Sequence, residues 1–174
     1  MKIGDIKVGR KILVKDVEFI LPKNGVINIS GKNGSGKTLL LRKLHQKLNK
    51  SSVLIDQENE EIIENISVIE NISLSTDEEK NNLIMKLLDK YNLKKLYSEC
   101  NVRYLSGGEK RFIAILRALH TGKEVLIFDE PSNDLDNNLI NILKTIMENE
   151  CNNKLIILVT HDDRFNRKYS SLEY

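Results

Sequence analysis

A glycine-rich stretch near the start of the chain has the residue types and spacing of a loop that binds phosphate. Residues 31–38 read Gly-Lys-Asn-Gly-Ser-Gly-Lys-Thr and fit the pattern G-x-x-x-x-G-K-[S/T]. Glycines allow successive backbone N–H groups to approach an anion. Lys37 would reach the β- and γ-phosphates of a nucleotide, and Thr38 would place its hydroxyl on Mg²⁺. The alternative is a glycine turn before an ordinary cationic helix.

A second glycine-rich turn lies further along, where residues 105–109 read Leu-Ser-Gly-Gly-Glu. It opens a predicted helix in which Ile113 and Leu116 are apolar packing positions. The N–H groups at the start of a helix form a second potential anion site. A chain with both turns is expected to contact a nucleoside triphosphate from two sides.

Two acidic residues, Asp129 and Glu130, follow the apolar run Val125–Phe128. A carboxylate at the carboxyl end of a buried parallel strand lies beside the phosphate loop in sheets of this kind. Asp129 could then hold Mg²⁺ through water, and Glu130 could polarise the attacking water. The alternative is an acidic loop that merely follows a strand.

His161 follows the last apolar strand, Leu155–Thr160. One of its ring nitrogens could donate a hydrogen bond to the γ-phosphate and so report whether the nucleotide is intact. A lone histidine more often has a structural role, and that alternative stays open on spacing alone. His45 and His120 lie on predicted helices, and we interpret both as surface or packing residues.

The elements that must position these residues alternate between short apolar runs and helical patterns. Leucines at positions 40, 41, 44 and 48 predict an amphipathic helix over Lys37–Leu48. Ser75 and Glu78 have capping-box spacing and predict another helix, whose buried face would hold Leu83, Ile84, Leu87, Leu88 and Tyr91. The predicted strands cover residues 11–19, 26–30, 53–56, 125–128 and 155–160. Fully apolar strands separated by helices indicate an α/β fold, with a parallel sheet covered on both faces.

Composition narrows the class of protein. The 174 residues are 40% hydrophobic and 30% charged with a net charge of +2, which indicates one globular domain without a basic surface for nucleic acid. No apolar run approaches the roughly 18 residues of a membrane span. The first residues lack the apolar core of a signal peptide, so we expect a cytoplasmic protein. Cys100 and Cys151 lack ligand spacing and are interpreted as free thiols.

Together these residues resemble the ATP-binding cassette (ABC) family over nearly the whole chain. The order of motifs agrees: the phosphate loop, Gln57, the signature at 105–109, the pair at 129–130, the loop at 132–136 and finally His161. The resemblance implies a P-loop NTPase-type fold with a small helical subdomain at about 62–104 and a reduced N-terminal β-subdomain. It also implies ATP and Mg²⁺ as cofactors and a head-to-tail dimer around two ATP molecules.

The same resemblance assigns a role to each site residue. Glu130, His161 and Gln57 would be catalytic, with Gln57 sensing Mg²⁺ and the attacking water, and Thr38, Gln57 and Asp129 would hold the metal. The nucleotide-binding residues would be Gly31, Lys32, Asn33, Gly34, Ser35, Gly36, Lys37, Thr38, Leu39, Ser106, Gly107 and Gly108. The last three would cover the ATP of a second subunit.

Three departures from the family pattern indicate a compact cassette. No aromatic residue that could stack on adenine occurs over residues 1–18, where the corresponding place falls near Lys7 or Val8. A preference for ATP over GTP is therefore not implied. Leu39 replaces the hydroxyl residue that commonly follows Thr38. Only nineteen positions separate Thr38 from Gln57, which shortens the usual antiparallel sub-sheet. Weak nucleotide binding by the isolated subunit is expected.

The leading functional hypothesis is an ATPase subunit that drives a membrane transporter through a separate permease, at the inner face of the cell membrane. Residues 68–72, Val-Ile-Glu-Asn-Ile, resemble the stretch after the glutamine in exporter-type cassettes and favour export. The alternative is a soluble, non-transport cassette resembling the translation-associated ABC-F group, although those proteins carry two cassettes. A chromosome- or repair-type cassette would need a long coiled coil before the signature, and none is predicted.

Overall fold

The computed structural model describes residues 1–8, 11–18, 20–56, 62–74, 82, 85–86, 88–93, 101–166 and 170–173. The chain divides into two compact units. The first unit comprises Met1–Gln57, Lys123–Pro131 and Met147–Tyr174, and the second comprises Glu58–Gly122 and Ser132–Ile146. Within the described residues, no helix has both the length and the apolar composition that crossing a membrane requires.

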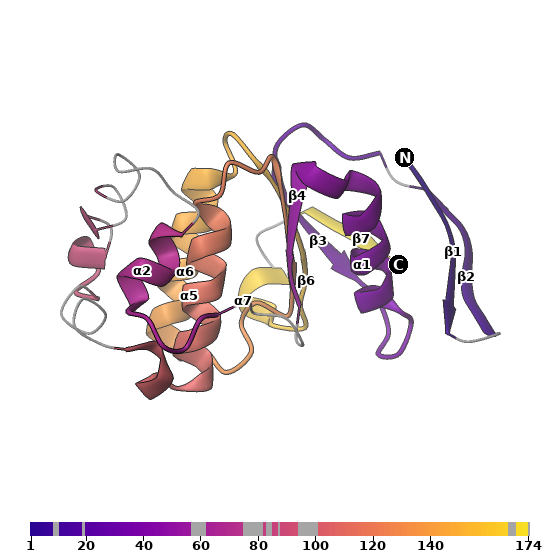
Figure 1. Cartoon of the computed structure of the whole chain (residues 1–174). Coiled ribbons are helices and arrows are strands. Elements are labelled where there is room, and N and C mark those ends of the chain that lie inside the picture. Colours follow the sequence, from indigo (N-terminus) through magenta and orange to yellow (C-terminus); the bar gives the residue numbers. More distant parts are fainter. Residues whose placement is uncertain are drawn as a thin grey trace. The chain divides into compact units, whose positions relative to one another are not determined.

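The first unit is built on a parallel sheet of five strands in the order β4-β5-β6-β3-β7 (Figure 1). The strands are β3 (Gly25–Ser30), β4 (Ser52–Ile55), β5 (Val125–Asp129), β6 (Leu155–Val159) and β7 (Ser170–Glu173). Every residue of β5 and β6 is buried. The predicted parallel α/β class is confirmed, because only a sheet covered on both faces buries whole strands.

Helix α1 (Lys37–Leu48) begins where the phosphate loop ends, and its bounds are those predicted. It contacts β4 and β5 of the sheet. Leu40, Leu41 and Leu44 are fully buried, and they join Ile27, Ile29, Ile127 and Ile157 in one apolar core. The loop between β3 and α1 is therefore anchored at both ends by elements of that core. A short 3₁₀ turn, η1 (Asn49–Ser51), leads from α1 into β4.

A two-stranded antiparallel sheet, β1 (Lys2–Val8) and β2 (Lys11–Glu18), also belongs to the first unit. β2 was predicted and β1 was not. Register shifts at Gly4 break the pairing, and Gly4 has a φ of 79°. Such irregularities break the alternation of apolar and polar residues by which a strand is recognised. Ile3 and Ile6 are nevertheless buried in the core with α1, and Lys43 of α1 donates a hydrogen bond to the carbonyl of Asp5.

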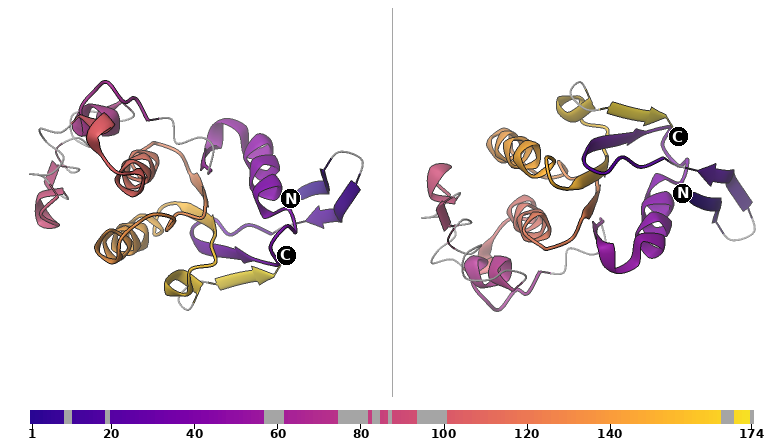
Figure 2. Two further views of the ribbon diagram at one scale, coloured as in Figure 1. Left: turned by 90° about the horizontal axis from the view of Figure 1, so that it is seen from below. Right: turned by 90° about the horizontal axis from the view of Figure 1, so that it is seen from above.

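The second unit contains α2 (Val68–Ser73), the 3₁₀ turn η2 (Val102–Tyr104) and α5 (Gly107–Leu119). Helix α6 (Asn137–Glu150) begins in this unit, and α7 (Asp163–Asn166) belongs to the first. α2 contacts α5, as Figure 2 shows from two sides. α5 begins at Gly107 as predicted, and all its residues from Arg111 to Leu119 are buried. Of the helix predicted after Ser75, Leu88 is fully buried, whereas Ser75, Glu78, Leu83, Ile84 and Leu87 lie outside the described residues.

Residues 63–67 and 69–73 both read Ile-Glu-Asn-Ile-Ser, but the two copies do not form the same structure. The second copy lies in α2, while the first copy precedes that helix. The fully buried Asn71 joins the two: its Oδ1 accepts from the Ile63 N–H at 2.9 Å and its Nδ2 donates to the Ile63 carbonyl at 2.9 Å. Buried amides are paired in this way because an unpaired one costs free energy.

Candidate functional site

The phosphate loop turns sharply between β3 and α1. Gly34 has a φ of 76° and Gly36, the residue before α1, has a φ of 98°. Residues other than glycine rarely adopt this conformation, so the turn itself requires glycine at positions 34 and 36. Gly36 has no side chain that could cap the start of α1. The first N–H groups of α1 are therefore available to an external acceptor such as phosphate.

Lys37 is held over this loop. It is buried, with only 8% of the residue exposed. The Nζ donates hydrogen bonds to the carbonyls of Gly31 at 2.9 Å and Lys32 at 3.0 Å. A buried ammonium needs such acceptors, and the loop thereby keeps a positive charge next to its own N–H groups.

A cavity of about 450 Å³ opens beside the loop, and most of the predicted site residues of the first unit line it, although Gly31, Lys32 and Ser35 are not among its lining residues. Its lining includes Asn33, Gly34, Gly36, Lys37, Thr38, Leu39, Asp129, Glu130 and His161, together with Leu13 and Val159. The hydroxyl of Ser35, in the same loop, is buried and has no hydrogen-bond partner among the described residues. A buried hydroxyl without a partner indicates that a ligand atom completes the loop.

Thr38 and Asp129 meet at one side of this cavity. The Thr38 Oγ1 donates to the Asp129 Oδ2 at 2.6 Å, and Asp129 is only 1% exposed. A hydroxyl and a carboxylate are oxygen ligands of the kind that Mg²⁺ prefers when phosphates complete its coordination. The described residues contain no group of three or more His, Cys, Asp or Glu side chains that could hold a metal by themselves. The residues present thus fit a magnesium ion that arrives with a nucleotide.

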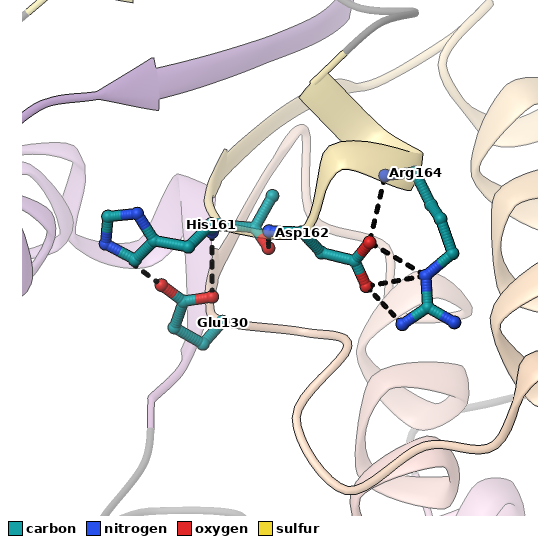
Figure 3. A network of polar contacts seen from close by, with 5 residues as sticks. Glu130, His161, Asp162 and Arg164 are labelled. Atoms are coloured by element: carbon teal, nitrogen blue, oxygen red, sulfur yellow. Dashed lines mark hydrogen bonds and ion pairs between the residues drawn. The ribbon is translucent and has the colours of Figure 1, made fainter.

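Glu130 and His161 lie together at the carboxyl ends of the neighbouring strands β5 and β6 (Figure 3). Glu130 has a φ of 50°, and its N–H donates to the Val159 carbonyl at 2.7 Å. Its Oε2 accepts from the His161 N–H at 3.2 Å, and its Oε1 is 3.7 Å from the His161 Nε2. A left-handed backbone at a residue other than glycine is strained, and such strain gathers at functional sites. The side chain of Glu130 is thereby fixed, while that of His161 stays 53% exposed.

The residues after His161 hold its backbone in place (Figure 3). The Asp162 N–H donates to the Thr160 Oγ1 at 3.0 Å, and the Arg164 N–H donates to the Asp162 Oδ1 at 2.9 Å. The Arg164 Nε also donates to Asp162 at 2.8 Å. This hydrogen bond with the carboxylate raises the pKa of Arg164. His161 therefore projects from a fixed turn.

The signature turn, residues 106–108, begins α5 in the second unit. Ser106 and Glu109 form a capping box: the Glu109 N–H donates to the Ser106 Oγ at 3.3 Å, and the Ser106 N–H donates to the Glu109 Oε2 at 2.8 Å. The Ser106 hydroxyl also donates to that carboxylate, at 2.8 Å. Both donors of Ser106 are therefore engaged by Glu109.

The two glycines of the turn differ in their surroundings. A Cβ on Gly108 would lie 2.0 Å from the Asp134 carbonyl oxygen, whereas a Cβ on Gly107 would meet nothing within 4 Å. Gly108 therefore allows the loop at 132–136 to lie against the start of α5. Gly107 is exposed and leaves its side of the helix start open.

The sequence located nearly every described lining residue of the cavity, and two were missed. Leu13 and Val159 are aliphatic residues of β2 and β6, and nothing in their types distinguishes them from core positions. Gln57 lies outside the described residues. Ser106, Gly107 and Gly108 belong to the second unit, and the structure describes them there without testing their predicted role.

The chain also resembles known proteins in sequence. A family model described as "ABC transporter" matches residues 14–133. An ATP-binding protein of Clostridium tetani (strain Massachusetts / E88), assigned by its name to an ABC transporter, is 34% identical and aligns with 93% of this chain and 43% of its own length. The alpha-hemolysin translocation ATP-binding protein HlyB of Escherichia coli O157:H7 is 29% identical, over 86% of this chain and 26% of its own length.

The ATP-binding protein Uup of Buchnera aphidicola subsp. Acyrthosiphon pisum (strain APS) is 32% identical, over 88% of this chain and 28% of its own length. The chain thus spans less than half of the length of each of these three relatives. Among solved structures, the dimeric structure of MJ0796, a bacterial ABC transporter cassette, superposes with a TM-score of 0.74 at 21% identity, over 98% of this chain and 91% of that one. This likeness shows the fold.

Proposed function

Because the chain belongs to the ABC ATPase family, whose members hydrolyse ATP, we propose that it is the ATP-hydrolysing subunit of a membrane transporter. In this proposal residues 1–174 form a single ABC ATPase domain, which pairs with a second such subunit around two ATP molecules. The observation that carries it is the convergence of the phosphate loop, Thr38, Asp129, Glu130 and His161 on one cavity.

The phosphate loop and α1 would bind the triphosphate. The free N–H groups at the start of α1 and the positive end of the helix dipole attract an anion. Lys37 already lies within the loop, so its ammonium would exchange the carbonyls of Gly31 and Lys32 for phosphate oxygens without a large movement. Mg²⁺, held by Thr38 and Asp129, would neutralise charge on the β- and γ-phosphates.

Glu130 would act as the general base. Its carboxylate is fixed by the His161 N–H and borders the cavity, so it can accept a proton from a water that attacks the γ-phosphate. The exposed ring of His161 can donate a hydrogen bond to the same phosphate. Gln57 would orient the water and the metal. Phosphoryl transfer depends mainly on positioning and electrostatics, which these residues would supply.

The signature turn would complete the site of a second copy. Its open side at Gly107 can receive a phosphate, and two helix starts would then contact the same γ-phosphate. The relative MJ0796 is described as dimeric, which supports pairing. ATP would thus hold two subunits together, and hydrolysis would loosen the pair.

Transport is supported by several relatives that are named for it, and export in particular by one of them. HlyB is named for the translocation of alpha-hemolysin, and residues 68–72 of this chain resemble the exporter-type pattern. In this proposal the chain lies in the cytoplasm, at the inner face of the membrane, and acts on a separate permease. A protein with several membrane spans should then co-purify with the tagged full chain from lysates that preserve membranes. Its absence from such preparations would contradict the transport role.

A second candidate is a translation-associated, ABC-F-like role. The energy-dependent translational throttle protein EttA of Escherichia coli (strain K12), which is 28% identical over 74% of this chain, favours it. The net charge of +2 supports it poorly, because binding to a ribosome depends on neutralising phosphates. The two roles separate in one measurement: co-sedimentation with ribosomes that survives moderate salt would favour this candidate over transport.

A further inference from the structure

An exposed pair of side chains lies immediately before the signature turn. Arg103 and Tyr104 both belong to η2, and the guanidinium carbon of Arg103 is 5.4 Å from the centre of the Tyr104 ring. This separation is within the range of a cation–π contact. Tyr104 is 76% exposed. The pair therefore presents an aromatic and cationic surface of the kind on which nucleobases stack.

The backbone that carries this pair is fixed on both sides. Val102 is fully buried, and its N–H donates to the Ile66 carbonyl at 3.4 Å. Leu105 is only 8% exposed, and its N–H donates to the Val102 carbonyl at 3.0 Å. The Asn101 side chain accepts from the Arg103 N–H at 3.1 Å. A ring that projects from a fixed turn loses little conformational entropy when it contacts a ligand.

The cavity of the first unit lacks such a surface. Among its lining residues, all within the described part of the chain, none is aromatic. The apolar ones are the aliphatic Leu13, Leu39 and Val159. A nucleotide held at the phosphate loop thus finds no stacking partner for its base in this lining.

We propose that Arg103 and Tyr104 contact the base of the nucleotide held at the phosphate loop of a second copy of this chain. The inference rests on the proposed function, in which the signature turn covers the γ-phosphate of that nucleotide. Tyr104 precedes Gly107 by three residues, and three residues span at most about 10 Å even when extended. Tyr104 is therefore close along the backbone to the residue that would meet the γ-phosphate, and in this inference its exposed ring contacts the nucleoside end of the same triphosphate. Stacking accepts any base, so this surface serves ATP and GTP alike.

The test uses the full chain with Glu130→Gln, so that ATP persists, and measures the ATP concentration at which two subunits pair. Tyr104→Ala should raise that concentration about tenfold, since base stacking contributes on the order of tenfold or more in affinity. Tyr104→Phe keeps the ring and should leave it unchanged. Tyr91→Ala is the matched control, because Lys90 lies 5.4 Å from the Tyr91 ring in the same kind of pair.

Two further measurements separate this role from a structural one. Tyr104→Ala should leave the melting temperature unchanged, and at protein concentrations too low for pairing it should leave the affinity for a fluorescent ATP analogue unchanged. The inference is overturned if Tyr104→Ala pairs at the same ATP concentration as the parent, or if Tyr91→Ala raises that concentration as much as Tyr104→Ala does. It is also overturned if Tyr104→Ala weakens the binding of the ATP analogue to the unpaired chain as much as it weakens pairing. A parent that never pairs with ATP would instead contradict the proposed function, and with it this inference.

Discussion

Two helices begin with glycine-rich turns, yet the two starts are built differently. Gly36 gives α1 no side-chain cap, the first turn of α1 has no acidic residue, and Lys37 is its first residue. α5 begins with a capping box, and Glu109 in its first turn takes both donors of Ser106. A carboxylate near the positive end of a helix stabilises the helix and competes with an external anion. In the proposed function, α1 would therefore provide the main contact to the triphosphate, and α5 would contact a triphosphate that a second copy presents.

A third helix start serves as an internal reference for this difference. α2 has the same capping box, in which the Glu70 N–H donates to the Ser67 Oγ at 3.2 Å and the Ser67 N–H donates to the Glu70 Oε2 at 2.7 Å. Its first residue is the buried Val68, where α5 has Gly107. In α2 the capping box therefore only stabilises the start of the helix. In α5 the same capping box is followed by the exposed Gly107, which leaves room for a ligand.

The largest expected effect is on ATP hydrolysis at the cavity beside α1. Glu130→Gln should lower ATP turnover by about 10²–10⁴-fold, because an amide cannot accept the proton of the attacking water. ATP affinity should be retained, since Lys37 and the loop are unchanged. Steady-state hydrolysis measures the turnover, and a nucleotide titration measures the affinity. Glu124→Gln, in the exposed residue just before the same strand, is the control. Equal turnover in both variants would remove Glu130 from the role of base.

The next largest effect shows which of the two helix starts, α1 or α5, binds the nucleotide in the unpaired chain. Lys37→Ala should weaken ATP binding by the unpaired chain on the order of 100-fold, because charge-assisted hydrogen bonds to phosphate are lost. Lys110→Ala removes a lysine from the start of α5, where Lys110 pairs with Glu64 at 2.8 Å. It should leave that affinity unchanged. Comparable losses from the two substitutions would break the contrast between α1 and α5.

The two glycines of the signature turn should separate stability from pairing. Gly108→Ala would press a methyl group against the Asp134 carbonyl, and we expect it to lower the free energy of unfolding by about 1–3 kcal/mol. Gly107→Ala has open space, so its stability in urea denaturation should be near that of the parent, while ATP-dependent pairing weakens. If Gly107→Ala is the less stable of the two, the assignment of their roles is wrong.

The carboxylate of Glu109 would compete with an external anion at the start of α5, so removing its charge should strengthen the contact of α5 with a nucleotide. Glu109→Gln should lower the ATP concentration needed for pairing by about two- to five-fold, as expected for one charge near a helix end. Glu70→Gln makes the same change in the α2 cap and should leave pairing unchanged. Sedimentation velocity at several ATP concentrations measures both. A weaker pairing of Glu109→Gln would mean that the carboxylate supports the nucleotide contact.

The smallest expected effect is a pH dependence of the stability that the capping box of α2 contributes. Hydrogen bonds from Ser67 lower the pKa of Glu70 below its ordinary value of 4.5. The folded state therefore favours the ionised form, so the stabilisation is present above about pH 4.5 and is lost as the pH falls through the lowered pKa. Ser67→Ala should return the pKa of Glu70 towards 4.5, as measured by NMR titration. An unchanged titration would show that the cap does not hold the carboxylate.

Part of the fold and of the site could be predicted because it depends on neighbours in the chain. The helix Lys37–Leu48, the start of α5 at Gly107 and the apolar strands β5 and β6 follow from local periodicity and turn chemistry. β1 could not, because Gly4 interrupts its alternation and its burial depends on contact with α1. Leu13 was missed for a similar reason: its place at the cavity depends on where β2 packs.

By itself the sequence determined the family and the fold class, and it predicted which residues bind a triphosphate, since the loop at 31–38 and the pair at 129–130 specify donors, acceptors and their order. The tertiary structure alone decided how they meet. Parallel pairing of β5 with β6 brings Glu130 to His161, and the loop at 132–136 lies against Gly108. These contacts join residues distant in the chain, and strand register and steric fit, which no local pattern encodes, set their distances.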